Sequence, residues 1–119
     1  YLGLAYREKG DLDKSIFHLE KAIEMGISPK IDIYHADLAA VLESEYQYKQ
    51  AAHHFEKAHE YTQKPEYLFH LARNFDLYYK DKSIALKYYK KYLTSNDEKY
   101  QDYTRQRIEQ LKEIVHFQN

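Results

Sequence analysis

The amino-acid sequence predicts an all-α protein built from stacked helical hairpins, and three observations support this prediction. Apolar residues recur with the 3.6-residue period of amphipathic helices. One pattern of apolar and small residues occurs three times, at intervals of 33 to 36 residues. The two prolines lie between the repeated units, and the chain has only three glycines, which leaves little room for β-hairpin turns. At 119 residues, with 44% hydrophobic and 31% charged residues, the composition is that of one soluble globular domain.

The central unit, residues 37–58, is the clearest hairpin in the sequence. Each of its two helices carries three residues on one face of the helical period: Leu38, Ala39 and Leu42, then Ala51, Phe55 and Ala58. We expect the small Ala39 to face Ala51 and Ala58, because small side chains let two helices approach closely. A hairpin of this kind keeps one apolar face uncovered and therefore needs neighbours.

The neighbouring units repeat this pattern before and after the central one. The corresponding residues are Leu2, Gly3 and Tyr6 with Ser15, Leu19 and Ala22 in the first unit, and Leu71, Ala72 and Phe75 with Ala85, Tyr89 and Tyr92 in the third. Pro29 and Pro65 occupy equivalent places before the second and third units. The sequence therefore predicts three hairpins in register.

Turn and cap residues define the first two hairpins. A helix over residues 1–9 is followed by a Gly10–Asp11 turn, in which Asp11 caps a second helix over residues 12–25. Gly26 is expected to end that helix in the left-handed conformation. Ser28–Pro29 then opens a helix that reaches about Ser44, with Ser as the cap and Pro in the first turn.

The remaining helices follow in the same way. Residues 45–48 form a turn in which Tyr46 stands where the first unit has Gly10, so we expect this turn to have a different shape. The partner helix covers residues 48–61, and the third hairpin covers residues 65–79 and 82–94.

A last helix is predicted over residues 96–116. Ser95 and Glu98 have the spacing of a capping box, and the helix carries one apolar face formed by Tyr100, Thr104, Ile108, Leu111 and Val115. Tyr92 stands where the other units have alanine, so it needs a new neighbour. We expect the last helix to cover it as a cap for the stack; the alternative is a helix that docks on another molecule.

This arrangement resembles the tetratricopeptide repeat (TPR) family, whose unit is a helix–turn–helix of about 34 residues. The best match is the run from Leu2 to Tyr6 followed by Gly10–Asp11, and the resemblance covers about residues 1–94. It implies a single domain, a right-handed superhelical solenoid of three repeats (about 1–28, 29–64 and 65–94) with a C-terminal capping helix (about 96–116). The family pattern starts several residues before Leu2, so we expect this chain to be a fragment of a longer protein.

The sequence gives no support for catalysis, a cofactor or a metal site. There is no cysteine, no G-x-S-x-G elbow, no P-loop and no G-x-G-x-x-G motif. Seven histidines are present, but none has the spacing of helical metal ligands, and the adjacent His53 and His54 point about 100° apart. His18 and His54 occupy equivalent places and could stack along neighbouring helices; the alternative is that they are simply partly exposed, at a position that Tyr88 fills in the third unit.

A groove is the candidate site that the resemblance implies. In that family the first helix of each hairpin lines a concave surface that binds segments of other proteins. The corresponding residues here are Leu4, Arg7, Ala36, Asp37, Ala40, Glu43, Phe69, His70, Arg73 and Asp76. Together they predict a small apolar floor edged by charges, which suits a segment with an apolar anchor and a few charges. Alternatively, Arg73 pairs with Asp37 or Asp76 across the groove, and these faces serve only solubility.

The predicted function is therefore an adaptor that binds a protein or peptide partner. The main alternative is a self-assembly module that forms homo-oligomers through the open N-terminal repeat. Nucleic-acid binding through residues 87–92 is disfavoured, because Tyr89 belongs to the predicted core and the net charge is −1.

The net charge is unevenly distributed along the chain, −4 over residues 1–72 and +3 over residues 73–119. This asymmetry either orients a partner or reflects two halves that each have their own solvated face. No apolar run has the length of a membrane span, and both cytoplasm and periplasm suit the chain.

Overall fold

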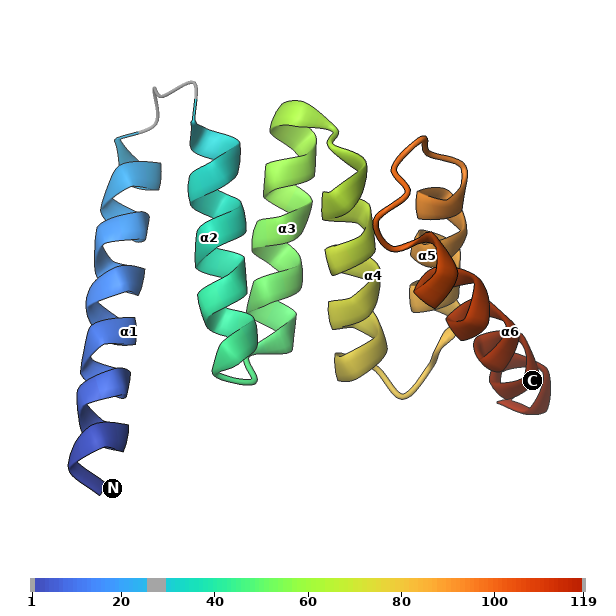
Figure 1. Cartoon of the computed structure of the whole chain (residues 1–119), viewed down its shortest axis with the longest axis horizontal. Helices are drawn as coiled ribbons and strands as arrows, with labels where there is room; N and C mark the ends of the chain where they lie inside the picture. Colours follow the sequence, from blue (N-terminus) through green and yellow to red (C-terminus); the bar gives the residue numbers. More distant parts are fainter. Residues whose placement is uncertain (1, 26–29, 119) are drawn as a thin grey trace.

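The computed structural model describes the backbone of residues 2–25 and 30–118, and the side chains of that part from Leu12 onward. These residues form six helices and no strand: α1 (Leu2–Glu24), α2 (Ile31–Ser44), α3 (Tyr48–Thr62), α4 (Pro65–Tyr78), α5 (Ser83–Leu93) and α6 (Gln101–Gln118). Each helix packs chiefly against its neighbours in chain order. The helices therefore form a row, with the two ends of the chain at opposite ends of it (Figure 1).

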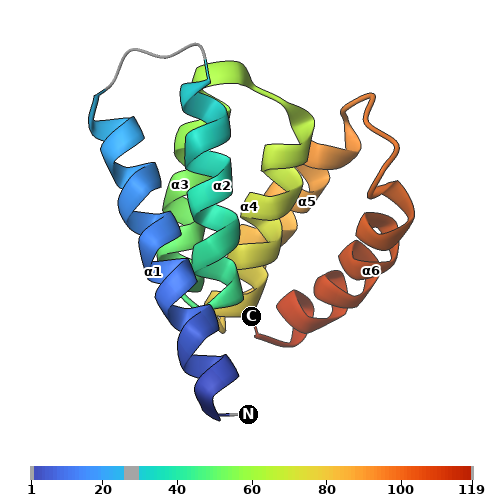
Figure 2. The same ribbon diagram turned by 60° about the vertical axis from the view of Figure 1, so that its left-hand side comes forward.

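The side view separates this row into two layers. Helices α2 and α4 lie in front of α3 and α5, and α6 crosses the end of the row at an angle (Figure 2). Helices α3, α4 and α5 begin and end within two residues of the predicted bounds. None of the helices in the described part of the chain is long and apolar enough to cross a membrane.

Helix α1 differs from the prediction. The prediction of a turn at Gly10–Asp11 is wrong, because one continuous helix of 23 residues passes through both positions. A glycine inside a helix costs only about 1 kcal/mol relative to alanine, and no proline forces a break in this stretch. Asp11 therefore lies within the helix and is not its cap. The expected caps at Gly26 and Ser28–Pro29 lie outside the described residues.

The crossing of α2 and α3 is built from small side chains, as predicted. Ala39, Ala51 and Ala58 are all fully buried, and Phe55 fills the space beside them. This cluster continues to Leu71 of α4. Burial of side chains this small lets the two backbones approach closely, so any added volume at these positions would have to separate the helices.

The turn between α2 and α3 has the shape of a Schellman motif. Tyr46 takes a φ of 64°, in the left-handed region that favours glycine. The amide of Gln47 donates to the carbonyl of Leu42 at 2.9 Å, and the amide of Tyr46 donates to that of Glu43 at 3.0 Å. The turn thus holds a tyrosine in a backbone conformation that favours glycine, at a cost of roughly 1–2 kcal/mol.

The second cluster lies where α4, α5 and α6 meet. Its buried members are Phe69, Ala72, Ala85, Leu86, Tyr89, Tyr92, Ile108 and Leu111. Tyr89 and Tyr92 are fully buried, and the predicted apolar face of α6 covers them. Phe75 and Tyr88 contact both this cluster and the α2–α3 cluster, so the core is continuous along the row.

The start of α6 also differs from the prediction. The expected capping box of Ser95 and Glu98 does not form, because the helix begins only at Gln101. Instead, the Tyr92 hydroxyl accepts a hydrogen bond from the Tyr100 amide at 2.9 Å and donates to the Asp97 carboxylate at 2.7 Å. A buried phenol from α5 thus holds the loop that leads into α6.

Candidate functional site

Two adjoining clefts lie between α4 and α6, with volumes of about 450 and 440 Å³. They share three lining residues, Asp76, Leu77 and Tyr103, and we call them together the α4–α6 cleft. The first part is otherwise lined by Lys82, Gln106, Arg107 and Gln110, and the second by Phe69, Arg73 and Tyr100. Two helices that are distant in sequence therefore form one recess.

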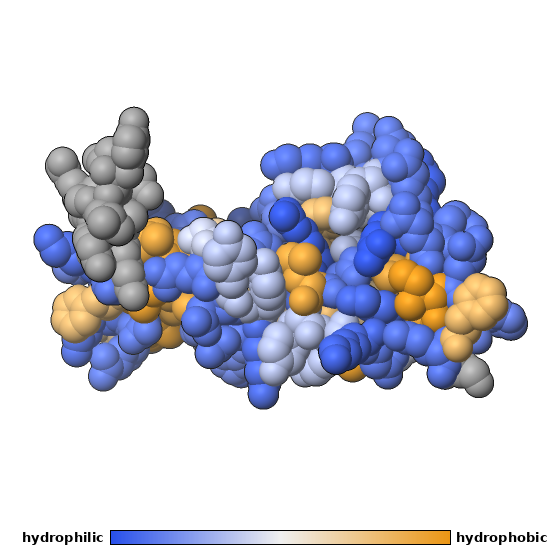
Figure 3. Space-filling model, turned by 90° about the horizontal axis from the view of Figure 1, so that it is seen from below, coloured by the Kyte–Doolittle hydropathy of each residue, from blue (hydrophilic) through white to orange (hydrophobic). Residues whose placement is uncertain are grey.

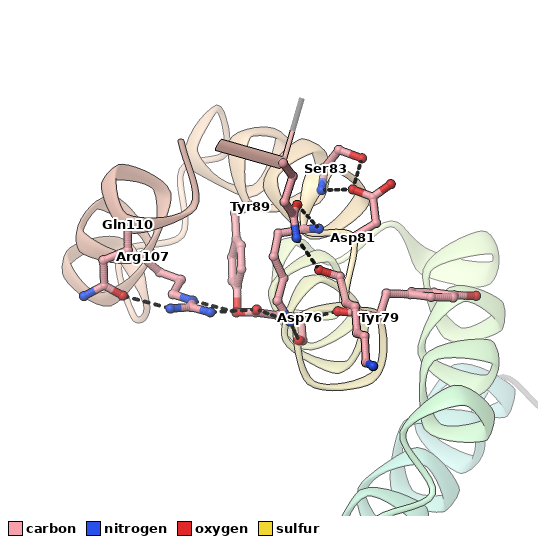
Figure 4. A network of polar contacts seen from close by, with 10 residues as sticks. Asp76, Tyr79, Asp81, Ser83, Tyr89, Arg107 and Gln110 are labelled. Carbon is pink, nitrogen blue, oxygen red and sulfur yellow. Dashed lines mark hydrogen bonds and ion pairs between the residues drawn. The ribbon is translucent and has the colours of Figure 1, made fainter. Parts of the chain in front are cut away.

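Asp76 is the buried carboxylate between the two parts of the cleft. Arg107 reaches it from α6 with two hydrogen bonds, Nε to Oδ2 at 2.7 Å and Nη2 to Oδ1 at 2.8 Å (Figure 4). The Tyr89 hydroxyl donates to Oδ2 at 3.2 Å, and the Lys82 ammonium lies 3.5 Å from Oδ1. A bidentate arginine–carboxylate pair is among the stronger polar contacts in proteins. It therefore fixes α6 against α4.

The electrostatics of Asp76 follow from these contacts. Burial by itself raises the pKa of this carboxyl group. The hydrogen bonds and charge of Arg107, with the charge of Lys82, outweigh burial, so the pKa of Asp76 lies below its ordinary value. Burial also raises the pKa of the Tyr89 phenol, which stays protonated and donates. Asp76 is thus an ionised, fully engaged group.

The end of α6 is attached to the same region. The side chain of Gln118 donates to the Lys80 carbonyl at 2.9 Å, in the loop between α4 and α5. The Lys82 ammonium donates to the Tyr79 carbonyl at 2.8 Å and also to the carbonyl of Asp76. These contacts tie the C-terminal end of α6 and the side chain of Lys82 to the loop between α4 and α5, and they join the network around Asp76 (Figure 4).

The upper part of the cleft has an aromatic wall. The Phe69 ring is stacked on Tyr100, with centroids 3.9 Å apart and planes within 2°. Leu77 and Tyr103 form an apolar rim, and each has 49% of its surface exposed. Arg73 lines the same part, is exposed, and has no ion pair with any residue in the described part of the chain. The recess therefore combines apolar surface with one available positive charge.

The predicted groove residues fall into three groups. The side chains of Leu4 and Arg7 lie outside the described side chains. On α2, Asp37 and Ala40 are exposed, whereas Ala36 and Glu43 are half-buried. The Glu43 carboxylate accepts a hydrogen bond from the Asn74 amide at 3.0 Å, which joins α2 to α4.

On α4 the prediction requires correction. Phe69 is not an open floor, because only 4% of its surface is exposed beneath Tyr100. Asp76 is not a groove rim, because Arg107 and Lys82 hold it in the interior. The half-buried His70 stacks on Phe55 with ring centroids 5.1 Å apart.

Arg73 alone among the predicted α4 residues faces solvent, and it pairs with neither Asp37 nor Asp76 in the described structure. The face of α2 stays open, while α6 closes the adjoining part of α4. From below, hydrophobic side chains form separate patches among hydrophilic ones (Figure 3).

The sequence interpretation missed the contributions of α6 to this site. Tyr103 and Arg107 are four residues apart on one face of the helix, and Gln110 follows three residues later. This spacing forms a stripe beside the apolar face that was predicted to cap the stack. This second stripe of helically spaced residues is the sequence signal for these side chains, although it does not identify Asp76 as their partner.

A pair of histidines lies where α2 crosses α3. The rings of His35 and His54 are stacked with centroids 5.2 Å apart, and their Nδ1 atoms are 3.0 Å apart. His54 thus stacks on His35 and not on His18, with which stacking was one of two possibilities; the His18 ring lies 5.7 Å from that of Phe17. Burial, then the charges of His35 and His53, lower the pKa of His54 to about 4. The described residues contain no group of three or more His, Cys, Asp or Glu arranged to hold a metal ion.

No protein-family model matches the chain, and no curated protein sequence matches it either. The role of the α4–α6 cleft must therefore be inferred from its own residues.

Proposed function

We propose that this chain is a helical-repeat module of the tetratricopeptide type that binds a segment of a partner protein and performs no catalysis. In this proposal α2–α3 and α4–α5 are complete repeats of a right-handed solenoid. Helix α1 takes the place of the first hairpin, and α6 caps the other end. Support comes from the consecutive packing of the helices and from the buried alanines at equivalent crossings.

The α4–α6 cleft is the observation that carries the binding role. It offers the exposed surfaces of Leu77 and Tyr103, beside the guanidinium of Arg73, which forms no ion pair within the described part of the chain. Aromatic residues and arginine dominate the energetics of protein interfaces. An apolar side chain seated between Leu77 and Tyr103 would place a neighbouring carboxylate near Arg73. The expected partner segment therefore has an apolar anchor followed or preceded by an acidic residue.

The open face of α2 extends this surface. Asp37 and Ala40 are exposed, so an extended segment could continue from the cleft across a mixed polar and apolar strip.

Acid–base catalysis is disfavoured by the contacts of the titratable groups in the α4–α6 cleft. Asp76 is occupied by two cations and is not available as a base, and the raised pKa of Tyr89 keeps its proton in place.

Selection from a displayed peptide library tests this proposal. Peptides retained by the wild-type chain should lose at least about tenfold in affinity for Arg73→Glu, because a favourable charge at the cleft becomes repulsive. Lys49→Glu, at an exposed position near the start of α3 and outside these clefts, makes the same change of charge and should bind like the wild type. The readout is fluorescence anisotropy with the selected peptides.

Two outcomes would contradict the proposal. One is equal binding by wild type and Arg73→Glu. The other is failure to select any peptide while the mass of the chain increases with concentration, which would favour the self-assembly alternative.

A further inference from the structure

We propose that the outer face of α5 is a second docking surface, which binds an acidic segment of a partner protein. This face is defined by Ser83, Leu86, Lys87, Lys90, Lys91 and Thr94, which line a shallow cleft of about 460 Å³. It shares no residue with the α4–α6 cleft. We call it the α5 lysine face.

The charge on this helix is unusual for the chain. Among the six described helices, α5 is the only one with basic residues and no acidic residue. On α6, by contrast, Arg105 and Lys112 each pair with an acid three residues away. No carboxylate in the described part of the chain lies within ion-pair distance of Lys87, Lys90 or Lys91.

The electrostatics of the helix end account for only two of these three lysines. Lys90 and Lys91 lie in the last turn, where positive charge is favourable near the carbonyl end of a helix. Lys87 lies one turn earlier, where this effect has faded. Its ammonium lies 5.9 Å from the Tyr88 ring centroid, and that of Lys91 lies 4.9 Å from the same ring. The half-buried Tyr88 thus orders two of the three charges on the surface.

Apolar surface accompanies the charges. Leu86 is part of the lining of the lysine face. Lys90 also borders an adjoining groove of about 320 Å³ between α5 and α6, which Leu93 and Ile108 help to line. A segment with regularly spaced aliphatic residues and several carboxylates matches this combination, because its acids can meet the lysines while its apolar side chains pack in the adjoining groove beside the half-buried Leu93.

The observations favour a protein partner over nucleic acid or a lipid surface. Tyr89 and Tyr92 are fully buried and cannot stack on bases, and the ring of Tyr88 lies beside Lys87 and Lys91. Membrane association of a helix needs large apolar side chains that project outward among the basic ones. Leu86, the apolar member of the α5 lysine face, has only 9% of its surface exposed.

Fluorescence anisotropy with a defined probe tests the proposal. The probe is a labelled peptide of Glu and Asp with leucine at every third or fourth position, and its neutral counterpart carries Gln and Asn instead. The wild-type chain should bind the acidic probe saturably and the neutral probe at least about tenfold more weakly. Binding should weaken as NaCl rises from about 50 to about 300 mM, because salt screens exposed charges.

Charge-matched variants locate the binding surface. Lys87→Glu, Lys90→Glu and Lys91→Glu together should lower the affinity at least about tenfold. The control combines Lys14→Glu, Lys49→Glu and Lys80→Glu, three exposed lysines elsewhere that have the same total charge change. It should stay within about threefold of the wild type. Circular dichroism of both variants checks that the helices persist, and the Gln versions of the first variant replace it if they do not.

Three results would overturn the proposal. The first is no saturable binding of the acidic probe by the wild type. The second is equal loss of binding in both variants, which would indicate a net-charge effect. The third is tighter binding of polyuridylate or of phosphatidylserine vesicles than of the acidic peptide.

Discussion

At the scale of single residues, the His35–His54 pair makes stability depend on pH. One Nδ1 must donate and the other accept across their 3.0 Å contact, so both rings cannot be protonated together. Burial, with the charges of His35 and His53, lowers the pKa of His54 from 6.5 to about 4. Between these values the unfolded chain binds the proton and the folded chain does not. The contribution of neutral His54 to the free energy of unfolding is therefore fully present above about pH 6.5, and it is lost as the pH falls toward 4.

Urea unfolding between these pH values measures the effect. His54→Gln should flatten the dependence, because glutamine does not titrate and can still hydrogen-bond His35. Burial also lowers the pKa of His59 and His70, so part of the slope should remain. His116→Gln, at the exposed end of α6, is the control. An unchanged slope in His54→Gln would show that the pair does not control this dependence.

The buried ion pair of Asp76 and Arg107 is the second single-residue feature that should affect stability. Asp76→Asn should destabilise the chain by about 3 kcal/mol, because it leaves the Arg107 guanidinium without its carboxylate at a mostly buried site. Asp102→Asn makes the same chemical change in an exposed pair with Arg105 and should leave the free energy of unfolding nearly unchanged. Chemical denaturation of both variants is the measurement. Equal stabilities would mean that the buried pair does not hold α6.

At the scale of elements, the contact of α2 with α3 depends on small side chains. Ala58→Leu should destabilise the chain by about 1–3 kcal/mol, because the added methyl groups force the helices apart. Ala40→Leu is the same substitution on the exposed face of α2 and should change stability by less than about 0.5 kcal/mol. Thermal or urea unfolding distinguishes them. If Ala58→Leu unfolded like the wild type, the register of α3 would be wrong.

The continuity of α1 is the second point at this scale. In an unbroken helix, Gly10→Ala should stabilise the chain by about 0.5–1 kcal/mol, because alanine loses less backbone entropy than glycine. Gly3→Ala is placed near the start of α1, where fraying should make the gain smaller. Unfolding midpoints and far-ultraviolet circular dichroism provide the readout. A loss of stability in Gly10→Ala would instead indicate a turn that needs the freedom of glycine.

At the scale of the whole molecule, the row of helices is longer than a sphere of the same mass. A typical compact, near-spherical domain of this length would have a radius of gyration of about 13.5 Å. The Cα atoms have a radius of gyration of 15.9 Å and extents of 43 × 38 × 24 Å. Small-angle X-ray scattering of the monomer should therefore give a value near or slightly above 16 Å, because hydration adds to it. A value near that of the sphere would contradict the extended row.

The sequence by itself determined the helices and their buried faces wherever local spacing carried the information. The bounds of α3, α4 and α5, and the burial of Ala39, Ala51 and Ala58, follow from helical periodicity and from proline and small residues. The apolar face of α6 and its contact with Tyr92 were predictable for the same reason. These features depend on residues within one or two turns of each other.

Only the tertiary structure decided where α6 lies and what it closes. Arg107 meets Asp76 across 31 residues, and Tyr100 stacks on Phe69, so two predicted groove residues are buried and a cleft forms beside them. The passage of α1 through Gly10 and the capping of the α6 loop by Tyr92 were likewise not evident from local signals. The physical reason is that a cap, a turn or an ion pair is chosen by competition among all available partners. Spacing along the chain specifies the near partners and leaves the distant ones undetermined.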